Sequence, residues 1–295
     1  MPAKLWIAAI ALATTPVAEQ TPLERGKYLV EGILTCGNCH TPRGPGGVLD
    51  TTRRHAGGPQ VWETAEYRVH PSNITPDKQT GIGGWSAVQI KAGIRDGKRP
   101  SGQQLSPQMP YAYYQIFAPA DLDAVVAYMQ SLPPVSRTVE PPVYKVKRMT
   151  LDVPPGAQKP LPDVAMKDPV KRGFYLVTIG HCMECHTPIA DGHRDFANAL
   201  GTGGERFEGP WGVSVSRNIT SHKANGIGAW TDEEVKRAIT KGVRKDGTKL
   251  RPPMGYDWYA TMTEADLSAI VAYVRTIPAA RAAPARAPRA LSIPL

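Results

Sequence analysis

An internal duplication constrains the fold of this chain more than any other feature of its sequence. When the sequence is shifted along itself by 145 or 146 positions, the same short motifs recur in the same order. The recurring positions include Cys36 and Cys182, Asn73 and Asn218, Gly81 and Gly226, Met109 and Met254, and Tyr128 and Tyr273. We therefore expect two copies of one domain, and 295 residues are enough to give each copy its own core.

Composition marks the ends of the two copies. Residues 136–167 are rich in proline and lack an apolar period, which predicts an extended, semi-rigid linker. Residues 279–295 are mostly alanine, proline and arginine, which predicts a disordered tail. The two domains are therefore expected to span residues 20–135 and 168–278.

Residues 1–19 have the order of features found in a secretory signal peptide. Lys4 supplies a positive charge, an apolar stretch follows from Leu5 to Leu12, and small residues continue to Ala18. A frayed N-terminus is the alternative interpretation. Export predicts a periplasmic protein. Any contact with the cytoplasmic membrane would be peripheral, since no internal stretch approaches the roughly 20 apolar residues of a spanning helix.

Each copy is predicted to consist of short helices separated by long loops, because the chain has 29 prolines and 28 glycines. The closing helix of each copy carries apolar residues at spacings of three and four, which predicts one buried face. These residues are Leu122, Val125, Val126, Met129 and Leu132, and then Leu267, Ile270, Val271, Val274 and Ile277. Strand signals are scarce, so we predict an all-α chain of two tandem domains.

A second helix in each copy is predicted to begin with a capping box, in which two residues three positions apart bond each other's backbone. The pairs are Ser86 with Gln89 and Thr231 with Glu234. Gly93 and Gly242 are the next glycines along the chain, and we expect the two helices to end there.

The motif Cys-x-x-Cys-His, the attachment motif of haem c, occurs once in each copy. Its residues are Cys36, Cys39 and His40, and then Cys182, Cys185 and His186. Two thiols one helical turn apart can bond the two vinyl groups of a porphyrin, and the histidine that follows is placed to bind the iron. A zinc site would need the two cysteine pairs close together, and a disulfide framework would leave the histidines unexplained. The sequence predicts two covalently bound c-type haems.

A methionine is the expected second iron ligand in each copy. Met109 and Met254 lie 69 and 68 residues after His40 and His186, in loops that contain proline. Filling a gap in the core is the commoner role of methionine, but recurrence at the same place in both copies favours ligation. His70 is the alternative to Met109, although the second copy has no histidine at that place.

Other residues have both a functional and a structural interpretation. Arg95 and Arg244 lie in Gly-x-Arg runs and could bind haem propionates, or the runs could simply be turns. Trp85 and Trp230 could pack against a haem edge or anchor the start of a helix. The remaining histidines do not recur between the copies, and exposed loop positions are expected for them. They are His55, His181, His193 and His222.

The chain has 35 lysines and arginines against 26 aspartates and glutamates, a formal net charge of +9 before haem propionates are counted. A basic surface favours an acidic partner or anionic lipid. No recognisable nucleic-acid reader module or interleaving of basic and aromatic residues is present, so we expect no nucleic-acid partner.

With these motifs the chain resembles two tandem class I cytochrome c domains. Gly26 with Tyr128, and Gly173 with Tyr273, look like the glycine–aromatic crossing of the first and last helices in that family. The Asn-Ile-Thr, Gly-Ile-Gly-x-Trp and Met-Pro-Tyr motifs resemble the cytochrome subunits of bacterial periplasmic alcohol, aldehyde, gluconate and molybdenum-containing dehydrogenases. Many such subunits carry three haem motifs whereas this chain has two, which puts membrane attachment and quinone contact in doubt.

The resemblance implies an electron-transfer protein or subunit rather than an enzyme. Such a protein would take electrons from a periplasmic dehydrogenase and pass them to another cytochrome, an oxidase or a quinone-linked acceptor. A di-haem peroxidase is the alternative, but it needs one haem whose sixth position can open and usually has two unlike domains. A haem-based sensor would need an output domain, which the sequence does not provide.

Overall fold

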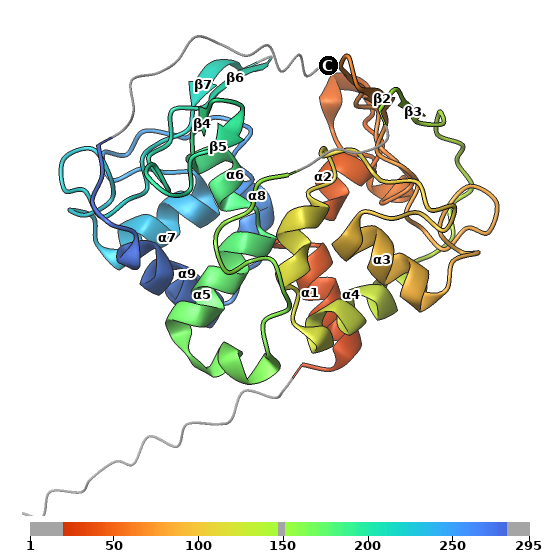
Figure 1. Ribbon diagram of the computed structural model, residues 1–295, viewed down its shortest axis with the longest axis horizontal. Helices are drawn as coiled ribbons and strands as arrows, with labels where there is room; N and C mark the ends of the chain where they lie inside the picture. The colour runs from red at the N-terminus through yellow and green to blue at the C-terminus, as the bar shows by residue number, and fades with distance from the viewer. Residues whose placement is uncertain (1–19, 147–150, 210, 282–295) are drawn as a thin grey trace, which may run out of the picture.

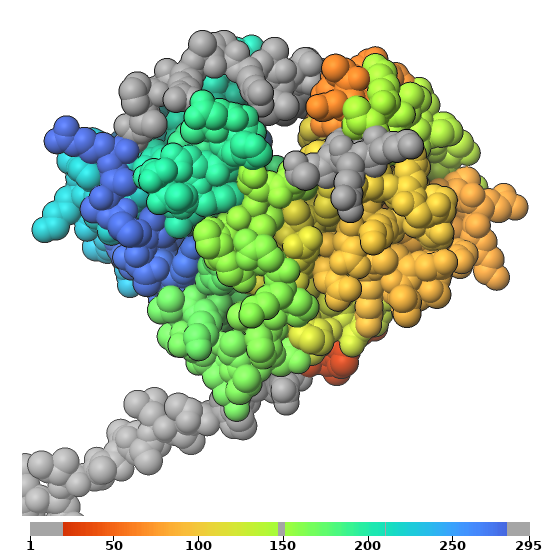
Figure 2. Space-filling view, viewed as in Figure 1, coloured from red at the N-terminus to blue at the C-terminus, as the bar shows by residue number. Residues whose placement is uncertain are grey.

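The computed structural model describes residues 20–146, 151–209 and 211–281 (Figure 1). The predicted signal peptide, residues 1–19, lies outside the described residues, and so does most of the predicted tail. Figure 1 and Figure 2 show the first half of the chain, coloured red to yellow, beside the second half, coloured green to blue. The main helices of the two halves recur in the same order, whereas the strands differ.

The first half consists of short helices joined by long loops, with a small sheet at its edge. Its helices are α1 (Pro22–Val30), α2 (Cys36–His40), α3 (Ala87–Asp96) and α4 (Pro119–Ser131), with 3-10 turns η1 (Pro45–Gly47), η2 (Thr51–Arg53) and η3 (Tyr111–Ile116). The antiparallel sheet joins β1 (Trp62–Glu63), β2 (Tyr67–Val69) and β3 (Val143–Tyr144) in that order.

The second half repeats this plan. Its helices are α5 (Pro169–Ile179), α6 (Cys182–His186), α7 (Asp232–Lys241), α8 (Tyr256–Tyr259) and α9 (Glu264–Thr276), preceded by η4 (Asp163–Lys167). Two hairpins pair β4 (Ile189–Ala190) with β5 (His193–Arg194), and β6 (Arg206–Gly209) with β7 (Gly212–Val215).

The prediction of an all-α chain is not confirmed, because the described residues contain seven short strands. Each strand has two to four residues, which is too short for an alternating apolar pattern to stand out in the sequence. Within the described part of the chain, no helix combines the length and the apolar character needed to cross a membrane.

In each half the first and last helices cross at a glycine. A Cβ on Gly26 would lie 2.0 Å from the Ala124 carbonyl oxygen of α4, and one on Gly173 would lie 1.9 Å from the Ala269 oxygen of α9. Only glycine lets the two backbones approach this closely. The crossing that the family resemblance implied is therefore present in both halves, and the apolar stripes of α4 and α9 are buried beside it as predicted.

The predicted capping boxes are confirmed, but one predicted helix end is wrong. Ser86 and Gln89 bond each other's backbone at the start of α3, as Thr231 and Glu234 do at the start of α7. Helix α7 ends at Gly242 as expected. Helix α3, however, continues through Gly93 and ends at Gly97, which has a φ of 63°. A Cβ on Gly93 would lie 3.3 Å from the Trp85 ring.

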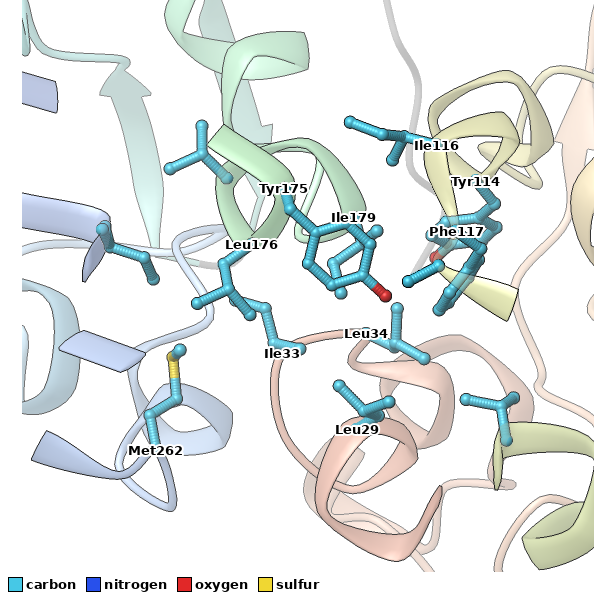
Figure 3. Packing of buried hydrophobic residues seen from close by; sticks show 14 of the residues in the cluster. Leu29, Ile33, Leu34, Tyr114, Ile116, Phe117, Tyr175, Leu176, Ile179 and Met262 are labelled. Carbon is cyan, nitrogen blue, oxygen red and sulfur yellow. The ribbon is translucent and has the colours of Figure 1, made fainter. Parts of the chain in front are cut away.

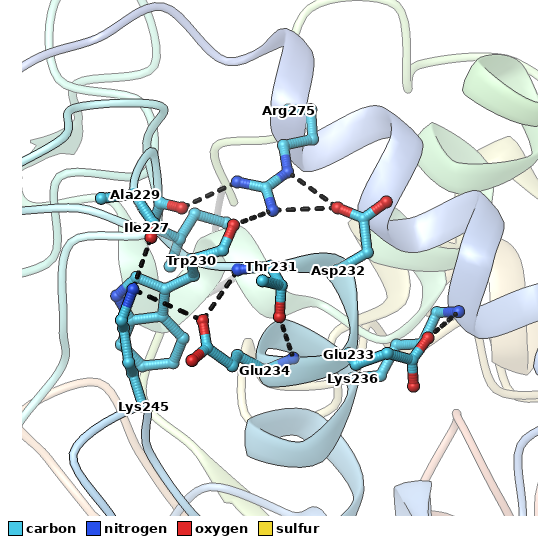
Figure 4. Close-up of polar contacts among 10 residues, drawn as sticks. All are labelled: Ile227, Ala229, Trp230, Thr231, Asp232, Glu233, Glu234, Lys236, Lys245 and Arg275. Atoms are coloured by element: carbon cyan, nitrogen blue, oxygen red, sulfur yellow. Dashed lines mark hydrogen bonds and ion pairs between the residues drawn. The ribbon is translucent and has the colours of Figure 1, made fainter.

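The tryptophan of the second copy is held in a different way at the start of α7. Arg275 of α9 donates to the carbonyl oxygens of Ile227 over 2.7 Å and of Trp230 over 2.6 Å, and pairs with Asp232 over 2.9 Å (Figure 4). These bonds fix the last helix to the loop before α7.

The two halves share one apolar core. Figure 3 shows Leu29 of α1, with Ile33 and Leu34 of the turn that follows it, facing Tyr175, Leu176 and Ile179 from α5, and all six are at most 4% exposed. A Cβ on Gly180 would lie 2.8 Å from Cδ1 of Ile33, so the chain turns after α5 directly against the first half. The burial of these apolar side chains stabilises the contact between the two halves.

The segment predicted to be a linker packs along the first half where it is described. Arg137 donates to the carbonyl oxygens of Ala56 and Gly57 over 3.0 Å, and β3 pairs with β2. The Leu161 amide donates to the carbonyl oxygen of Ile116 over 2.9 Å. These contacts fix the path of the chain from one half to the other.

The recurring Asn-Ile-Thr motif ties the segment after each last helix back to the loop that follows the attachment motif. The Asn73 amide donates to the carbonyl oxygen of Val135 over 2.8 Å and its oxygen accepts two bonds from Thr75. Asn218 donates in the same way to Ala280 over 2.7 Å. The motif thus has a structural role, and the same offset of 145 relates the two carbonyl groups.

Candidate haem-binding sites

The two Cys-x-x-Cys-His motifs form short helices of the same geometry. Helix α2 begins after Thr35, with a φ of 49°, and α6 begins after His181, with a φ of 41°. Both residues are in the left-handed region, so the chain turns sharply into each helix. Positions three apart in a helix share a face, which puts the two thiols of each motif on the same side.

All four cysteines are free thiols, which disfavours a disulfide framework. Burial raises the pKa of Cys36 and Cys182 to about 12 and that of Cys39 to about 11. The same effect raises the pKa of Cys185. The thiols are neutral groups in apolar surroundings, available for covalent bonding.

The histidine of each motif is held in one orientation by a backbone carbonyl. The Nδ1 of His40 lies 2.7 Å from the Ser72 oxygen, and the Nδ1 of His186 lies 2.6 Å from the Arg217 oxygen. A carbonyl can only accept, so Nδ1 carries the proton and Nε2 keeps the lone pair that a metal needs. Burial lowers the pKa of His40 to about 4 and also lowers that of His186, so both rings are neutral.

The two methionine loops are held by the same contact. Two residues after Met109, the ring of Tyr111 covers Gly97, where a Cβ would lie 2.6 Å from the ring. Two residues after Met254, Tyr256 covers Gly242 at 2.7 Å in the same way. The methionines themselves are half-buried against the core. The two loops are thus equivalent in structure as well as in sequence.

This equivalence corrects the pairing of the two arginine motifs. The glycines that cap α3 and α7 are Gly97 and Gly242, so Arg244 corresponds to Arg99. Arg95 lies in the last turn of α3 and pairs with the neighbouring Asp96 over 3.0 Å. Arg244 was paired with Arg95 in the sequence analysis because Gly93-Ile94-Arg95 has the same Gly-x-Arg pattern four residues before Arg99.

Each of the remaining histidines has a protein partner. His70 lies 3.1 Å from Glu140, His181 lies 3.1 Å from Glu184, and His193 lies 3.0 Å from Asp152. His222 accepts bonds from the amides of Ala224 and Asn225.

His55 was expected in an exposed loop, and this prediction is wrong. Its side chain is 0% exposed, and Nε2 lies 2.7 Å from Glu31, which also accepts a bond from Tyr128. The ring of His55 lies close to Gly37 of α2.

Sequence reasoning missed one tyrosine in each half. Tyr114 and Tyr259 are 4% and 8% exposed, and burial raises the pKa of each hydroxyl well above its ordinary value. The offset of 145 between the two tyrosines is the signal that could have identified them.

The donor set of this chain fits a c-type haem in each half. Each half offers a pair of free thiols, a histidine with a fixed tautomer and a methionine in an equivalent loop. Buried N–H donors that lack a partner among the described residues include Nε of Arg99, Nε of Arg237 and Nε1 of Trp211. Arginine and indole donors of this kind suit the carboxylate groups that a haem carries.

Several characterised proteins are similar to most of this chain. The chain is 31% identical over 279 residues to the fructose dehydrogenase cytochrome subunit of Gluconobacter japonicus, covering 90% of this chain and 54% of that protein. It is 28% identical over 290 residues to the cytochrome c subunit of the quinone alcohol dehydrogenase of Gluconacetobacter polyoxogenes, covering 92% and 59%. It is 28% identical over 254 residues to a diheme c-type cytochrome of Cereibacter sphaeroides, covering 83% and 82%.

The chain thus spans little more than half the length of the dehydrogenase subunits that it matches. The family model for cytochrome c matches it twice, at residues 23–133 and 170–278. These two segments make up most of the chain and contain the two motifs, the two methionine loops and the two helix crossings described above. The chain therefore belongs to the cytochrome c family, and its cofactors are two covalently bound c-type haems.

Proposed function

We propose that this chain is an electron-transfer protein that receives electrons from the catalytic subunit of a dehydrogenase. The observation that carries the proposal is the equivalence of the two halves, each of which offers the same ligands in the same local structure. The similarity to cytochrome subunits of dehydrogenases supports a partner of this class. We further propose that the acceptor is another cytochrome, an oxidase or a quinone-linked system, and that the protein works in the periplasm.

The residues divide into two roles. Cys36, Cys39, Cys182 and Cys185 form the thioether bonds. His40 with Met109, and His186 with Met254, would be the axial ligands that hold the iron. Each set belongs to one domain, residues 20–135 for the first and 168–278 for the second, with residues 136–167 as the linker. His70 is disfavoured as an alternative ligand because its Nε2 already faces Glu140.

Bound haem supplies reversible one-electron chemistry. The chain sets the conditions for it. The carbonyl groups of Ser72 and Arg217 hold the two histidine rings and strengthen them as ligands. A methionine in the sixth position raises the reduction potential relative to a second histidine. It also occupies the place that peroxide would need, which favours electron transfer over a peroxidase reaction.

The proposal is tested on purified holoprotein. Mass spectrometry is expected to find two haems on each chain, and the ferric spectrum is expected to be low-spin with the near-infrared band of methionine ligation. Mixing with a dehydrogenase of the fructose, alcohol or gluconate type and its substrate should reduce both haems. A high-spin haem that binds peroxide or cyanide readily would overturn the proposal in favour of a peroxidase.

A further inference from the structure

An aromatic side chain of the second domain packs against the attachment helix of the first. A Cβ on Gly37 would lie 2.7 Å from Cη2 and 3.2 Å from Cζ3 of Trp258. The indole ring therefore fills the space that a side chain at Gly37 would need. Gly37 is buried in α2, between Cys36 and Cys39. The far edge of the ring thus lies against the backbone that joins the two thiols of the first motif.

The reverse contact is made by Tyr113, which is 1% exposed. The Tyr113 ring lies 6.5 Å, centroid to centroid, from the ring of His181, in an edge-on arrangement at 63°. His181 is the residue before Cys182 and the first residue outside α6. An aromatic ring from the first domain is thus in contact with the attachment motif of the second.

Trp258 and Tyr113 are equivalent residues. They are related by the offset of 145 that relates the two methionines, and each comes four positions after the methionine of its own domain. Trp258 lies in α8 and Tyr113 in η3, the short elements that follow the methionine loops. Each ring therefore connects the methionine loop of one domain with the attachment motif of the other.

We propose that Trp258 and Tyr113 carry the electronic coupling between the two haems of this chain. The inference rests on the proposed function, because it needs a haem in each domain. One electron leaves the reduced iron of one domain and arrives at the oxidised iron of the other, and neither ring is itself oxidised or reduced. Tunnelling weakens steeply with the width of a gap and is better supported by packed atoms than by a void. Trp258 packs against Gly37 and Tyr113 against His181, so each ring offers packed atoms between the methionine loop of its own domain and the attachment motif of the other.

A purely structural role for the two rings makes a different prediction. If they only hold the domains together, replacing them would change stability and domain spacing but not the exchange rate at a fixed spacing. Tyr113 suits this comparison because its hydroxyl has no hydrogen-bond partner among the described residues. Tyr113→Phe therefore keeps the ring without breaking a bond. Trp258→Tyr keeps a ring of similar reach and copies the residue of the other domain.

The test uses holoprotein poised half-reduced, in which NMR exchange between haem methyl signals measures the rate of electron exchange within the chain. Trp258→Leu and Tyr113→Leu, made together, are expected to slow the exchange several-fold. Trp258→Tyr and Tyr113→Phe are expected to retain it. Phe174→Leu is the matched control, because that ring packs against Tyr273 of its own domain at 5.3 Å. It is expected to leave the rate unchanged.

Redox titration and small-angle X-ray scattering of the same variants separate the possible causes. The inference requires that the slower exchange occurs with both reduction potentials and the domain spacing unchanged. It is overturned if the double leucine variant exchanges as fast as the parent protein, or if the conservative variants are as slow as the leucine variants. Failure of the proposed function would be seen earlier, as a spectrum without two low-spin haems in the unmodified protein.

Discussion

The hydroxyl of Tyr28 in the first domain lies 2.7 Å from the carboxylate of Asp266 in the second, where it donates a hydrogen bond. Tyr175 of the second domain donates in the opposite direction to Asp121 of the first, over 2.8 Å. The offset of 145 relates the two aspartates, and the tyrosines are related by 147. The duplicated domains are thus joined by a reciprocal pair of contacts, close to a two-fold relationship.

Each of these aspartates also pairs with an arginine of its own domain. Arg25 pairs with Asp121 over 2.8 Å, and Arg172 pairs with Asp266 over 2.5 Å. The Asp266 side chain is fully buried and that of Asp121 nearly so. A carboxylate in such a position is tolerated only when its partners remain in place.

Asp121→Ala is therefore expected to destabilise the protein strongly. It leaves Arg25 without its closest carboxylate and the Tyr175 hydroxyl without an acceptor, and breaking a buried pair in this way costs about 3–5 kcal/mol. Tyr175→Phe removes a single bond to a charged group, worth about 1.5–3 kcal/mol. Chemical denaturation of the holoprotein measures both free energies of unfolding.

The matched control for Asp121 is Asp123, two residues further along α4. Its side chain is 61% exposed and pairs with Lys91 at the surface, so Asp123→Ala should change stability little. If the two substitutions lowered the free energy of unfolding equally, the contacts of Asp121 would not have the stabilising role described here.

Gly173→Ala is expected to loosen the crossing of α5 and α9. The new Cβ would lie 1.9 Å from a backbone oxygen, which can move only if the helices separate. Overpacking of this kind costs about 1–3 kcal/mol or more. Gly44→Ala is the control, because the nearest atom to its Cβ is 3.9 Å away. Thermal melting should show a clear loss for the first variant and almost none for the second.

Replacing one of the two methionines proposed as iron ligands should change one haem and leave the other unchanged. Met254→Leu is expected to lower one of the two reduction potentials and to open the sixth position of that haem, because leucine offers no sulfur ligand. Met262→Leu is a matched control, since this buried methionine fills the core of the same domain and the swap nearly conserves volume. Redox titration with visible spectra checks both, and a shift that is the same in the two variants would remove Met254 from the ligand set.

Much of the local structure could be predicted from the sequence. Capping residues such as Ser86 and Thr231 act within three positions of themselves, so their role is visible in a single copy. Because of the duplication, each motif occurs twice and the two copies can be compared. Met109 and Met254 could be selected from eight methionines because they occupy equivalent positions. Signals of both kinds are local or repeated, and a single sequence shows them.

The contacts between the domains could not be predicted in the same way. Tyr28 and Asp266 are 238 positions apart, and no spacing rule connects them. The aromatic character of Trp258 and Tyr113 fits equally well with an ordinary core residue. His55 was misplaced because its burial depends on Glu31, from a different element. The helix end at Gly97 was missed because Gly93 has the same residue type, and the left-handed φ of Gly97 is not visible in the sequence.

The contact between Tyr28 and Asp266 should also weaken at alkaline pH. Burial, followed by the charge of Asp266, raises the pKa of Tyr28 from 10.0 to about 12. In the unfolded chain the phenol keeps its ordinary pKa, so between pH 10 and about 12 the unfolded state has lost a proton that the folded state retains. The contribution of Tyr28 to stability is therefore complete below pH 10 and declines as the pH rises toward 12. Denaturation across this range should show a smaller decline for Tyr28→Phe than for the parent protein, and parallel curves would show that Tyr28 does not titrate in this way.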